Sequence, residues 1–428
     1  MSAHFPINRQ RLLQRFLRYV QVPTAAASES KSYPSSEGQL QLGSLLVDEL
    51  RAMGLSGARQ DENGLIWATI PASPSPAISS PAISSPAPAI LLNAHLDTSP
   101  EAPGAGIQPI VIESYGGGDI PLGTSGQTIR IADCPALKDL IRHTLVTTDG
   151  TTLLGGDDKA GVAAIMELAE HLLEHPELQH GPVEILFTCD EEIGRGTSKV
   201  PVENIPAVAG YTLDGSGAGE LDGENFSADH LIIKAIGHNI HPSLGKGRMI
   251  NAVRGLSKLV DRLPLDHMSP ESTEEREGFL HPYSITGGVG EAELRVLVRS
   301  FETEKLDMYA ALVRLAADRI EGELPGIRFD ITRERQYRNM AECLANHPLV
   351  MELAERAFQQ LGRPCSRGAI RGGTDGAMLS EKGLPTPNLS VGQHNIHSVL
   401  EFVSLDEMVA AVEHLVELTR LWQQHSRA

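Results

Sequence analysis

The chain has 428 residues, which is longer than one ordinary hydrophobic core supports, so we expect two domains. Its 41% hydrophobic and 21% charged residues are typical of a soluble globular protein. The formal net charge of −19 argues against nucleic acid or an anionic membrane as the main partner.

The spacing of the cysteines and the absence of long apolar runs indicate in which cellular compartment the protein lies. Four cysteines are scattered along the chain without a C-x-x-C pair, which favours a reducing environment over a disulfide framework. The N-terminus lacks the charged and apolar regions of a secretory signal, and no apolar run approaches transmembrane length. We therefore expect a cytoplasmic protein that does not bind membranes.

Helices and buried strands alternate in the first part of the chain. The apolar spacing predicts helices over 8–22, 39–53 and 162–173, and strands over 64–70, 89–94, 183–188 and 210–213. A Pro-Ala-Ile-Ser repeat at 75–89 interrupts this order. Because proline at this density does not fit a central strand, we interpret the repeat as an exposed loop insertion.

The pattern changes near Glu224. Strands are expected over 226–236, 291–301 and 327–332, with helices over 251–263 and 305–320. This β-α-β-α-β order predicts a compact α+β module, and helices over 348–361 and 405–424 follow it. We therefore predict an α/β domain formed by residues 1–223 and 338–428, interrupted by a two-layer α+β domain at 224–337.

Histidine and acidic side chains follow predicted strands or glycine-rich turns. The five that we select are His95, Asp157, Glu192, Asp214 and His397. Sites in open α/β sheets gather beyond the carboxyl ends of the strands, so these side chains can converge in space. Histidine and carboxylate together suit zinc, with cobalt or manganese as substitutes. If one carboxylate bridges, the set can hold two ions about 3.5–4 Å apart.

Two adjacent aspartates, Asp157 and Asp158, follow two glycines and precede an apolar helical run. Glycine allows the backbone to turn tightly, and two neighbouring anions repel each other unless a cation lies near them. We expect one of the two aspartates to bridge two metal ions.

Two short motifs provide second partners for the metal ligands. In His95-Leu96-Asp97 the alternating side chains point the same way, so Asp97 can orient His95. The triplet that ends in Glu191-Glu192 would ordinarily be a solvated acidic turn, but an apolar strand delivers it to the sheet edge. In an extended turn the two glutamates face different ways, so one can bind metal while the other acts as a base.

Together these motifs resemble the peptidase T family of tripeptide aminopeptidases, within the co-catalytic zinc peptidase superfamily that includes aminoacylase and succinyl-diaminopimelate desuccinylase. The resemblance runs over nearly the whole chain. The segments that carry it are 36–38, 95–98, 154–161, 190–194, 212–215, 245–247, 371–376 and 395–397. One departure is Gly156, which stands where the family usually has alanine.

The resemblance implies two ligand sets. One zinc would be bound by His95, Asp157 and Asp214, and the other by Asp157, Glu192 and His397. Asp157 is thereby selected as the bridge, and Asp158 becomes a residue of the loop or helix start. Because superfamily members often have a cis peptide after the bridging aspartate, we predict one between Asp157 and Asp158.

The resemblance also assigns the remaining roles. Asp97 would orient His95, and Glu191 would be the general base and then the acid towards the leaving amine. The inserted domain would be a lid that mediates homodimerisation, with its His241 reaching the partner subunit's active site to polarise the scissile carbonyl. Arg299 and Arg371 would hold the C-terminal carboxylate of a short peptide.

The predicted activity is removal of the N-terminal residue from tripeptides, with water activated by Glu191. One alternative is a dipeptidase or N-acyl-amino-acid amidohydrolase of the same superfamily. Another, of a different class, is a non-catalytic peptide-binding protein.

Overall fold

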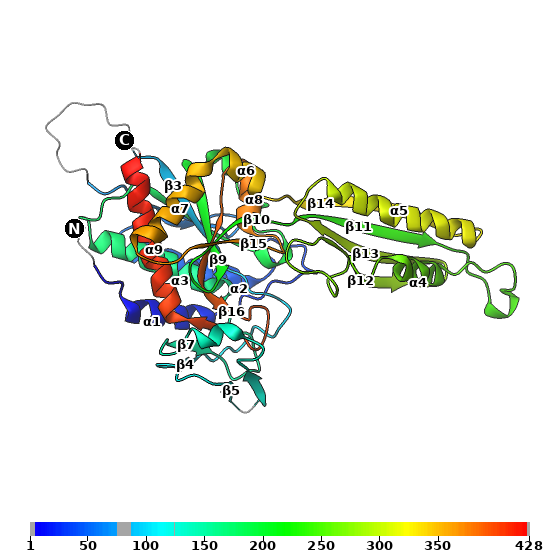
Figure 1. Ribbon diagram of the computed structural model, residues 1–428, viewed down its shortest axis with the longest axis horizontal. Coiled ribbons are helices and arrows are strands. Elements are labelled where there is room, and N and C mark those ends of the chain that lie inside the picture. The colour runs from blue at the N-terminus through cyan, green and yellow to red at the C-terminus, as the bar shows by residue number, and fades with distance from the viewer. Residues whose placement is uncertain (1–4, 75–86, 124, 426–428) are drawn as a thin grey trace. The chain divides into compact units, whose positions relative to one another are not determined.

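The structure is a computed structural model that describes residues 5–74, 87–123 and 125–425. The chain forms two compact units (Figure 1). The first comprises Met1–Gly223, Glu342–Gly368 and Thr374–Ala428, and the second Glu224–Ala341 and Ala369–Gly373. Most of the Pro-Ala-Ile-Ser repeat lies outside the described residues, so our interpretation of it stays a prediction.

The first unit is built on a large mixed sheet. The strands in sheet order are β1 (Arg59–Gln60), β2 (Ile66–Ile70), β8 (Val183–Thr188), β3 (Ala89–His95), β9 (Ala207–Ser216), β16 (Asn388–His394), β17 (Phe402–Ser404), β7 (Leu145–Thr147) and β4 (Ile110–Ile112). Strand β10 (Glu220–Asn225) pairs with β16, and β15 (Ser366–Ile370) pairs with β10. The short strands β5 (Ile120–Leu122) and β6 (Gln127–Ile129) form a separate pair.

The centre of this sheet is parallel. Strands β8, β3, β9 and β16 run in the same direction, so their carboxyl ends lie along one edge. Strand β3 is buried at every position, as expected for a parallel strand that is covered on both faces. The edge beyond these four strand ends is therefore the place where their following residues meet.

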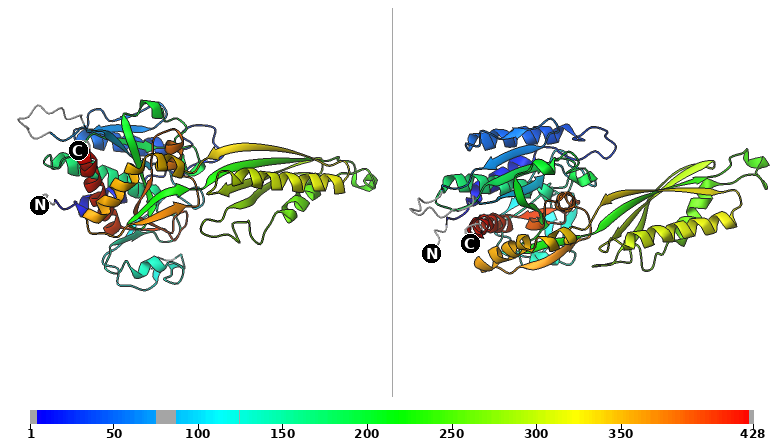
Figure 2. Two further views of the ribbon diagram at one scale, coloured as in Figure 1. Left: turned by 45° about the horizontal axis from the view of Figure 1, so that its top comes forward. Right: turned by 90° about the horizontal axis from the view of Figure 1, so that it is seen from above.

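Helices cover the parallel strands. The helices of this part of the chain are α1 (Arg9–Val20), α2 (Glu37–Ala52), α3 (Gly156–Glu174), α6 (Ala341–Asn346), α7 (Pro348–Gln360), α8 (Asp375–Glu381) and α9 (Leu405–His425). Helix α3 packs across β3, β9 and β16, and α1 and α9 pack against α3 (Figure 2). Because α3 lies between the sheet and two helices, it is apolar around most of its circumference.

The second unit is a two-layer structure. Its antiparallel sheet has the order β12 (Phe279–Gly287), β13 (Glu291–Ser300), β11 (Ser227–Ile236) and β14 (Arg328–Tyr337). Helices α4 (Ala252–Arg262) and α5 (Lys305–Glu323) contact each other and the same sheet, and they share one apolar core with it. The predicted α/β class with a separate α+β unit is confirmed.

The predicted order of helices and strands along the second unit was wrong in one respect. The structure has the order β-α-β-β-α-β, because β12 forms an additional strand beside β13. Strand β12 contains Pro282, and the pairing register shifts between Pro282 and Ser284. An edge strand tolerates a proline that a central strand would not, so the sequence of β12 does not have a regular strand pattern.

Among the described residues, no helix is long and apolar enough to cross a membrane. All four cysteines lie in the described part of the chain and are free thiols, as their spacing predicted.

Candidate metal centre

The ends of the parallel strands hold the predicted site residues of the first unit. His95 is the last residue of β3, Asp214 lies near the end of β9, and His397 follows β16. Glu192 follows β8, and Asp157 lies at the beginning of α3. The topology therefore brings five side chains from distant parts of the sequence to one edge of the sheet.

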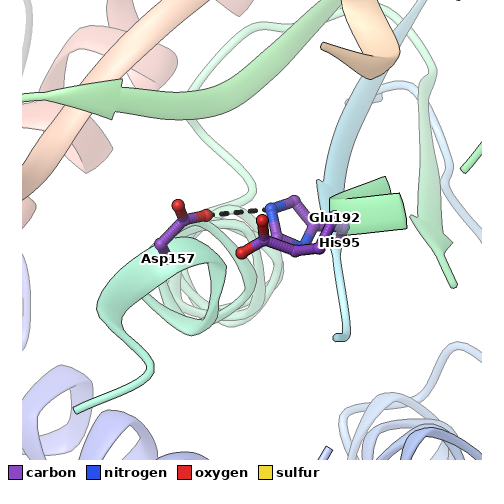
Figure 3. A group of neighbouring side chains, drawn as sticks. All are labelled: His95, Asp157 and Glu192. Atoms are coloured by element: carbon purple, nitrogen blue, oxygen red, sulfur yellow. Dashed lines mark hydrogen bonds and ion pairs between the residues drawn. The ribbon is translucent and has the colours of Figure 1, made fainter. Parts of the chain in front are cut away.

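Asp157 lies between the two histidines. Its Oδ1 is 2.9 Å from Nε2 of His95, and its Oδ2 is 3.2 Å from Nε2 of His397. Figure 3 shows the Asp157 carboxylate facing the His95 ring. Burial opposes the charge of Asp157, but hydrogen bonds from His397 and His95 outweigh it and lower the pKa of this carboxyl. One carboxylate with a different oxygen turned to each histidine has the geometry that a bridging ligand requires.

Glu192 and Asp214 complete the cluster on either side. Glu192 Oε2 is 2.9 Å from Nε2 of His397, and Asp214 Oδ1 is 3.7 Å from Nε2 of His95. Burial, followed by the charge of Asp157, raises the pKa of Glu192 to about 8 and that of Asp214 to about 7. Buried carboxylates at such short range retain their charge only if cations lie close to them.

Asp158 faces a different set of partners. The peptide bond between Asp157 and Asp158 is cis, as predicted. Asp158 Oδ2 accepts a hydrogen bond from the backbone N of His95 at 3.1 Å, and Oδ1 accepts one from Gln393 Nε2 at 2.9 Å. Asp158 also has an oxygen within 4.8 Å of ligand atoms of His95 and Asp214. The two aspartates therefore occupy different positions, with Asp158 hydrogen-bonded to the ends of two strands.

The donor set fits divalent metal ions. Ligand atoms of His95, Asp157 and Glu192 lie within 4.8 Å of one another. Glu192 Oε1 is buried and has no hydrogen-bond partner among the described residues, which is costly unless a cation or a proton binds it. Imidazole and carboxylate are ligands for zinc, cobalt and manganese alike. The chain thus carries candidate metal-binding groups at this edge of the sheet.

Asp97 supports this cluster in two ways. His95 Nδ1 lies 3.1 Å from the backbone oxygen of Asp97 and 3.5 Å from its Oδ1, so the ring contacts Asp97 on its far side. The two carboxylate oxygens each accept a hydrogen bond at 3.0 Å, from the backbone N of Glu191 and of Glu192. This second contact was missed in the sequence, and it fixes the glutamates relative to His95.

We had expected the acidic triplet to form an extended turn, but the structure shows a different conformation. Asp190 has a positive φ of 63°, and Glu191–Ile193 form a 3-10 helix. Glu192 points to His397, whereas Glu191 Oε2 lies 4.0 Å from Nε2 of His95. Burial, opposed by His95 and reinforced by the charge of Asp214, raises the pKa of Glu191. The two glutamates thus have different partners, although the turn differs from the expected one.

His397 has an orienting partner that sequence reasoning also missed. Its Nδ1 is 3.2 Å from Oε2 of Glu101, which lies six residues after His95. A carboxylate on the second ring nitrogen of a histidine fixes the tautomer that leaves the other nitrogen free for a metal. The segment from His95 to Glu101 thus contacts both histidines of the cluster.

Three predicted site residues belong to the second unit. His241 is exposed, and its Nδ1 lies 2.7 Å from Oγ of Ser243. The Arg371 guanidinium donates to the backbone oxygens of Thr273, Glu275 and Glu277, at 3.2, 2.7 and 3.1 Å respectively.

Arg299 lies beside Arg371 in the same unit. Its NH1 donates to the backbone oxygen of Arg371 at 3.3 Å. Its Nε is buried and has no hydrogen-bond partner among the described residues. The roles of His241, Arg299 and Arg371 stay predictions.

Comparison with known proteins identifies the family. The profile of peptidase family M20/M25/M40 matches residues 144–421. The chain is 41% identical over 417 residues to peptidase T from Geobacillus thermodenitrificans (strain NG80-2), covering 97% of this chain and 99% of that protein. This chain belongs to peptidase family M20/M25/M40. The resemblance noted in the sequence motifs is confirmed.

Other relatives of this M20 family member agree. Peptidase T from Aeromonas hydrophila is 42% identical over 410 residues, which cover 96% of this chain and 98% of that protein. The solved structure of aminopeptidase PepT from Bacillus cereus ATCC 10987 shares the fold, with a TM-score of 0.73, 23% identity and coverage of 97% and 99%. A tripeptidase from Staphylococcus aureus gives a TM-score of 0.74 at 23% identity, with coverage of 98% and 100%.

Proposed function

We propose that this M20 family member is a dinuclear zinc aminopeptidase that removes the N-terminal residue from tripeptides. The observation that carries the proposal is the Asp157 carboxylate, with one oxygen 2.9 Å from His95 and the other 3.2 Å from His397. The peptidase T relatives at 40–42% identity support the substrate class, as does the shared fold of a tripeptidase.

The proposed ligands form two overlapping sets. His95, Asp157 and Asp214 would hold one zinc ion, and Asp157, Glu192 and His397 the other, with cobalt or manganese as substitutes. When bound, the two ions supply Lewis-acid polarisation of the scissile carbonyl and favour deprotonation of the attacking water. The unpartnered buried Oε1 of Glu192 supports this assignment.

Glu191 is the proposed general base and then the general acid. Its carboxylate has no hydrogen bond to another described residue, and it lies 4.0 Å from Nε2 of His95. Because burial raises its pKa, the carboxylate can take a proton from the attacking water and hold it until the leaving amine accepts it.

The second unit supplies the rest of the proposal. We assign residues 224–337 to a lid and dimerisation domain inserted between the catalytic segments 1–223 and 338–428. In a homodimer, His241 would donate a hydrogen bond to the scissile carbonyl in the partner subunit's site. Ser243 N donates to Nδ1 of His241 at 3.4 Å, which leaves Nε2 as the protonated nitrogen of the neutral ring.

Arg299 and Arg371 are the proposed partners of the peptide's C-terminal carboxylate. Such a clamp would select short peptides, because a longer chain puts its terminus out of reach. The unpartnered Nε of Arg299 supports this role. Arg371, whose guanidinium already donates to backbone oxygens, would have to exchange some of these partners for the substrate. We also propose a cytoplasmic location, which the four free thiols support.

A panel of peptides tests the activity. Zinc-reconstituted protein is incubated with Ala-Ala, Ala-Ala-Ala and Ala-Ala-Ala-Ala, and with tripeptides that are acetylated at the N-terminus or amidated at the C-terminus. We expect release of N-terminal alanine from the free tripeptide at least about tenfold faster than from any other member, a difference of about 1.4 kcal/mol in activation free energy. Amino-acid release is followed by chromatography.

The other outcomes identify the rival functions. Preferred cleavage of the dipeptide or of an acetylated substrate would establish the dipeptidase or amidohydrolase alternative. Tripeptide binding without release of any amino acid, in protein that retains zinc, would establish the non-catalytic binding protein.

Asp97→Asn is expected to reduce both zinc affinity and kcat by about 10–100-fold. Glu191 N and Glu192 N donate to different oxygens of Asp97, so an amide in the same position places its NH2 group against one of these two N–H groups. Zinc affinity is measured by competition with a chelator. The control is Asp61→Asn in a remote turn, where two backbone N–H groups donate to the same oxygen, Oδ1, so the amide can keep both hydrogen bonds. Equal effects of the two substitutions would contradict a specific role of Asp97.

A further inference from the structure

Glu401 is a buried carboxylate outside the predicted ligand set. It lies four residues after His397 and is 1% exposed. Its Oε2 accepts hydrogen bonds from the backbone N of Leu154 and of Gly155, both at 2.8 Å. Its Oε1 accepts a hydrogen bond from the backbone N of Asp157 at 3.0 Å. A single side chain therefore binds most of the loop that precedes α3.

The loop needs such an acceptor. Leu154, Gly155, Gly156 and Asp157 are all buried, and a buried backbone N–H without a partner is costly. Gly155 has a φ of 78°, so the loop leaves the regular geometry in which neighbouring carbonyls would accept these hydrogens. Three N–H groups consequently converge on the Glu401 carboxylate.

We propose that Glu401 is a positioning residue of the metal centre. Glu401 joins the Leu154–Asp157 loop to the turn that carries His397, and it thereby holds Asp157 in line with both histidines. The inference rests on the proposed function, in which Asp157 bridges two metal ions. Because Asp157 contributes to both sites, loss of the contact between Glu401 and the loop weakens the binding of both ions.

Gly156 provides an independent observation of how closely the loop lies on this region. A Cβ atom at Gly156 would meet Val403 Cγ2 at 2.4 Å and Glu401 Oε1 at 3.0 Å. Val403 and Glu401 therefore leave no room for a side chain at this position. Close packing thus reinforces the hydrogen bonds, and both define the position of the Asp157 backbone.

The first test is Glu401→Gln, which has nearly the same shape. Its amide has a single acceptor oxygen, and its NH2 group would face a backbone N–H. We expect apo-protein of this variant to bind zinc about 10–100-fold more weakly than wild type, in competition with a chelator. Excess zinc should restore much of kcat, because the chemistry itself is unchanged.

Glu167→Gln is the matched control. Glu167 is also a fully buried glutamate of the first unit, but it accepts hydrogen bonds from Arg11 and Arg15 instead of the metal-site loop. We expect this substitution to lower thermal stability and leave zinc affinity unchanged. A folded Glu401→Gln protein with wild-type zinc affinity would overturn the inference.

A pair of glycine variants keeps the inference testable if Glu401→Gln does not fold. Gly156→Ala should weaken zinc binding by displacing the loop, and Gly156→Ala with Val403→Ala should recover affinity because the shortest contact is removed. Unchanged zinc affinity of Gly156→Ala would overturn the inference. Wild-type protein that binds zinc but hydrolyses no peptide would overturn the proposed function. The role of Glu401 would still hold if Glu401→Gln and Gly156→Ala bind zinc more weakly than wild type.

Discussion

Glu191→Gln is expected to lower kcat for tripeptide hydrolysis by a factor of about 10²–10⁴ while the protein still binds zinc. The amide has nearly the same shape as the carboxylate, but it cannot accept a proton from water. Glu191 Oε2 lies 4.0 Å from His95 Nε2, whereas the carboxylate of Glu192 lies 2.9 Å from His397. Loss of a base, and not loss of a ligand, is therefore the expected consequence.

Three measurements on the same preparation separate these consequences. Steady-state kinetics with Ala-Ala-Ala gives kcat and KM, metal analysis gives the zinc content, and calorimetry gives the affinity of the variant for the intact peptide. We expect kcat to fall, KM to change little, and zinc content to equal that of wild type. The control is Glu203→Gln, because Glu203 is an exposed residue of the same unit.

Two results would contradict this role. Unchanged hydrolysis by Glu191→Gln would exclude Glu191 as the base. Loss of zinc together with activity would instead make Glu191 a ligand, and the division of roles between Glu191 and Glu192 would have to be reversed.

The positions of the central strands could be predicted because burial on both faces produces continuous apolar runs. Strand β8 (Val183–Thr188) begins and ends where the sequence predicted it, and β3 extends the predicted strand by one residue to His95. Strand β12 could not be predicted, because it lies at an edge and contains Pro282. The pairing with β13 that makes this segment a strand exists only after folding.

The convergence of the proposed ligands was predictable for a similar reason. A residue that follows a parallel strand lies at the carboxyl edge of the sheet, whichever strand it follows. The hydrogen bonds that aim these ligands were not predictable. Glu401 contacts Leu154 N and Asp97 contacts Glu191 N, and both pairs are separated by at least 94 positions in the sequence. Such contacts between side chain and backbone depend on tertiary packing and leave no periodic pattern in the sequence.

The single substitutions Asp157→Asn and Asp158→Asn are expected to differ in their effect on metal content. Asp157→Asn removes a charge that would belong to both zinc sites, so we expect loss of more than one zinc ion per chain. The reduction in kcat/KM should exceed the 10–100-fold that is typical for loss of a partner of a metal ligand. Asp158→Asn keeps an oxygen that can accept from the backbone N of His95, so we expect it to retain both ions.

The comparison is sharp because the two residues are adjacent and the substitutions are identical. Zinc content after dialysis and the visible spectrum of the cobalt-substituted protein report directly on the ligands, without reference to substrate.

Asp158 also has an oxygen within 4.8 Å of ligand atoms of His95 and Asp214. If Asp158→Asn loses zinc and Asp157→Asn retains it, Asp158 is the bridging residue. If each substitution removes one ion, the two aspartates serve separate sites, and no single carboxylate bridges them. Loss of both ions in Asp157→Asn alone is the result that a bridging Asp157 requires, since only a shared ligand links the two occupancies.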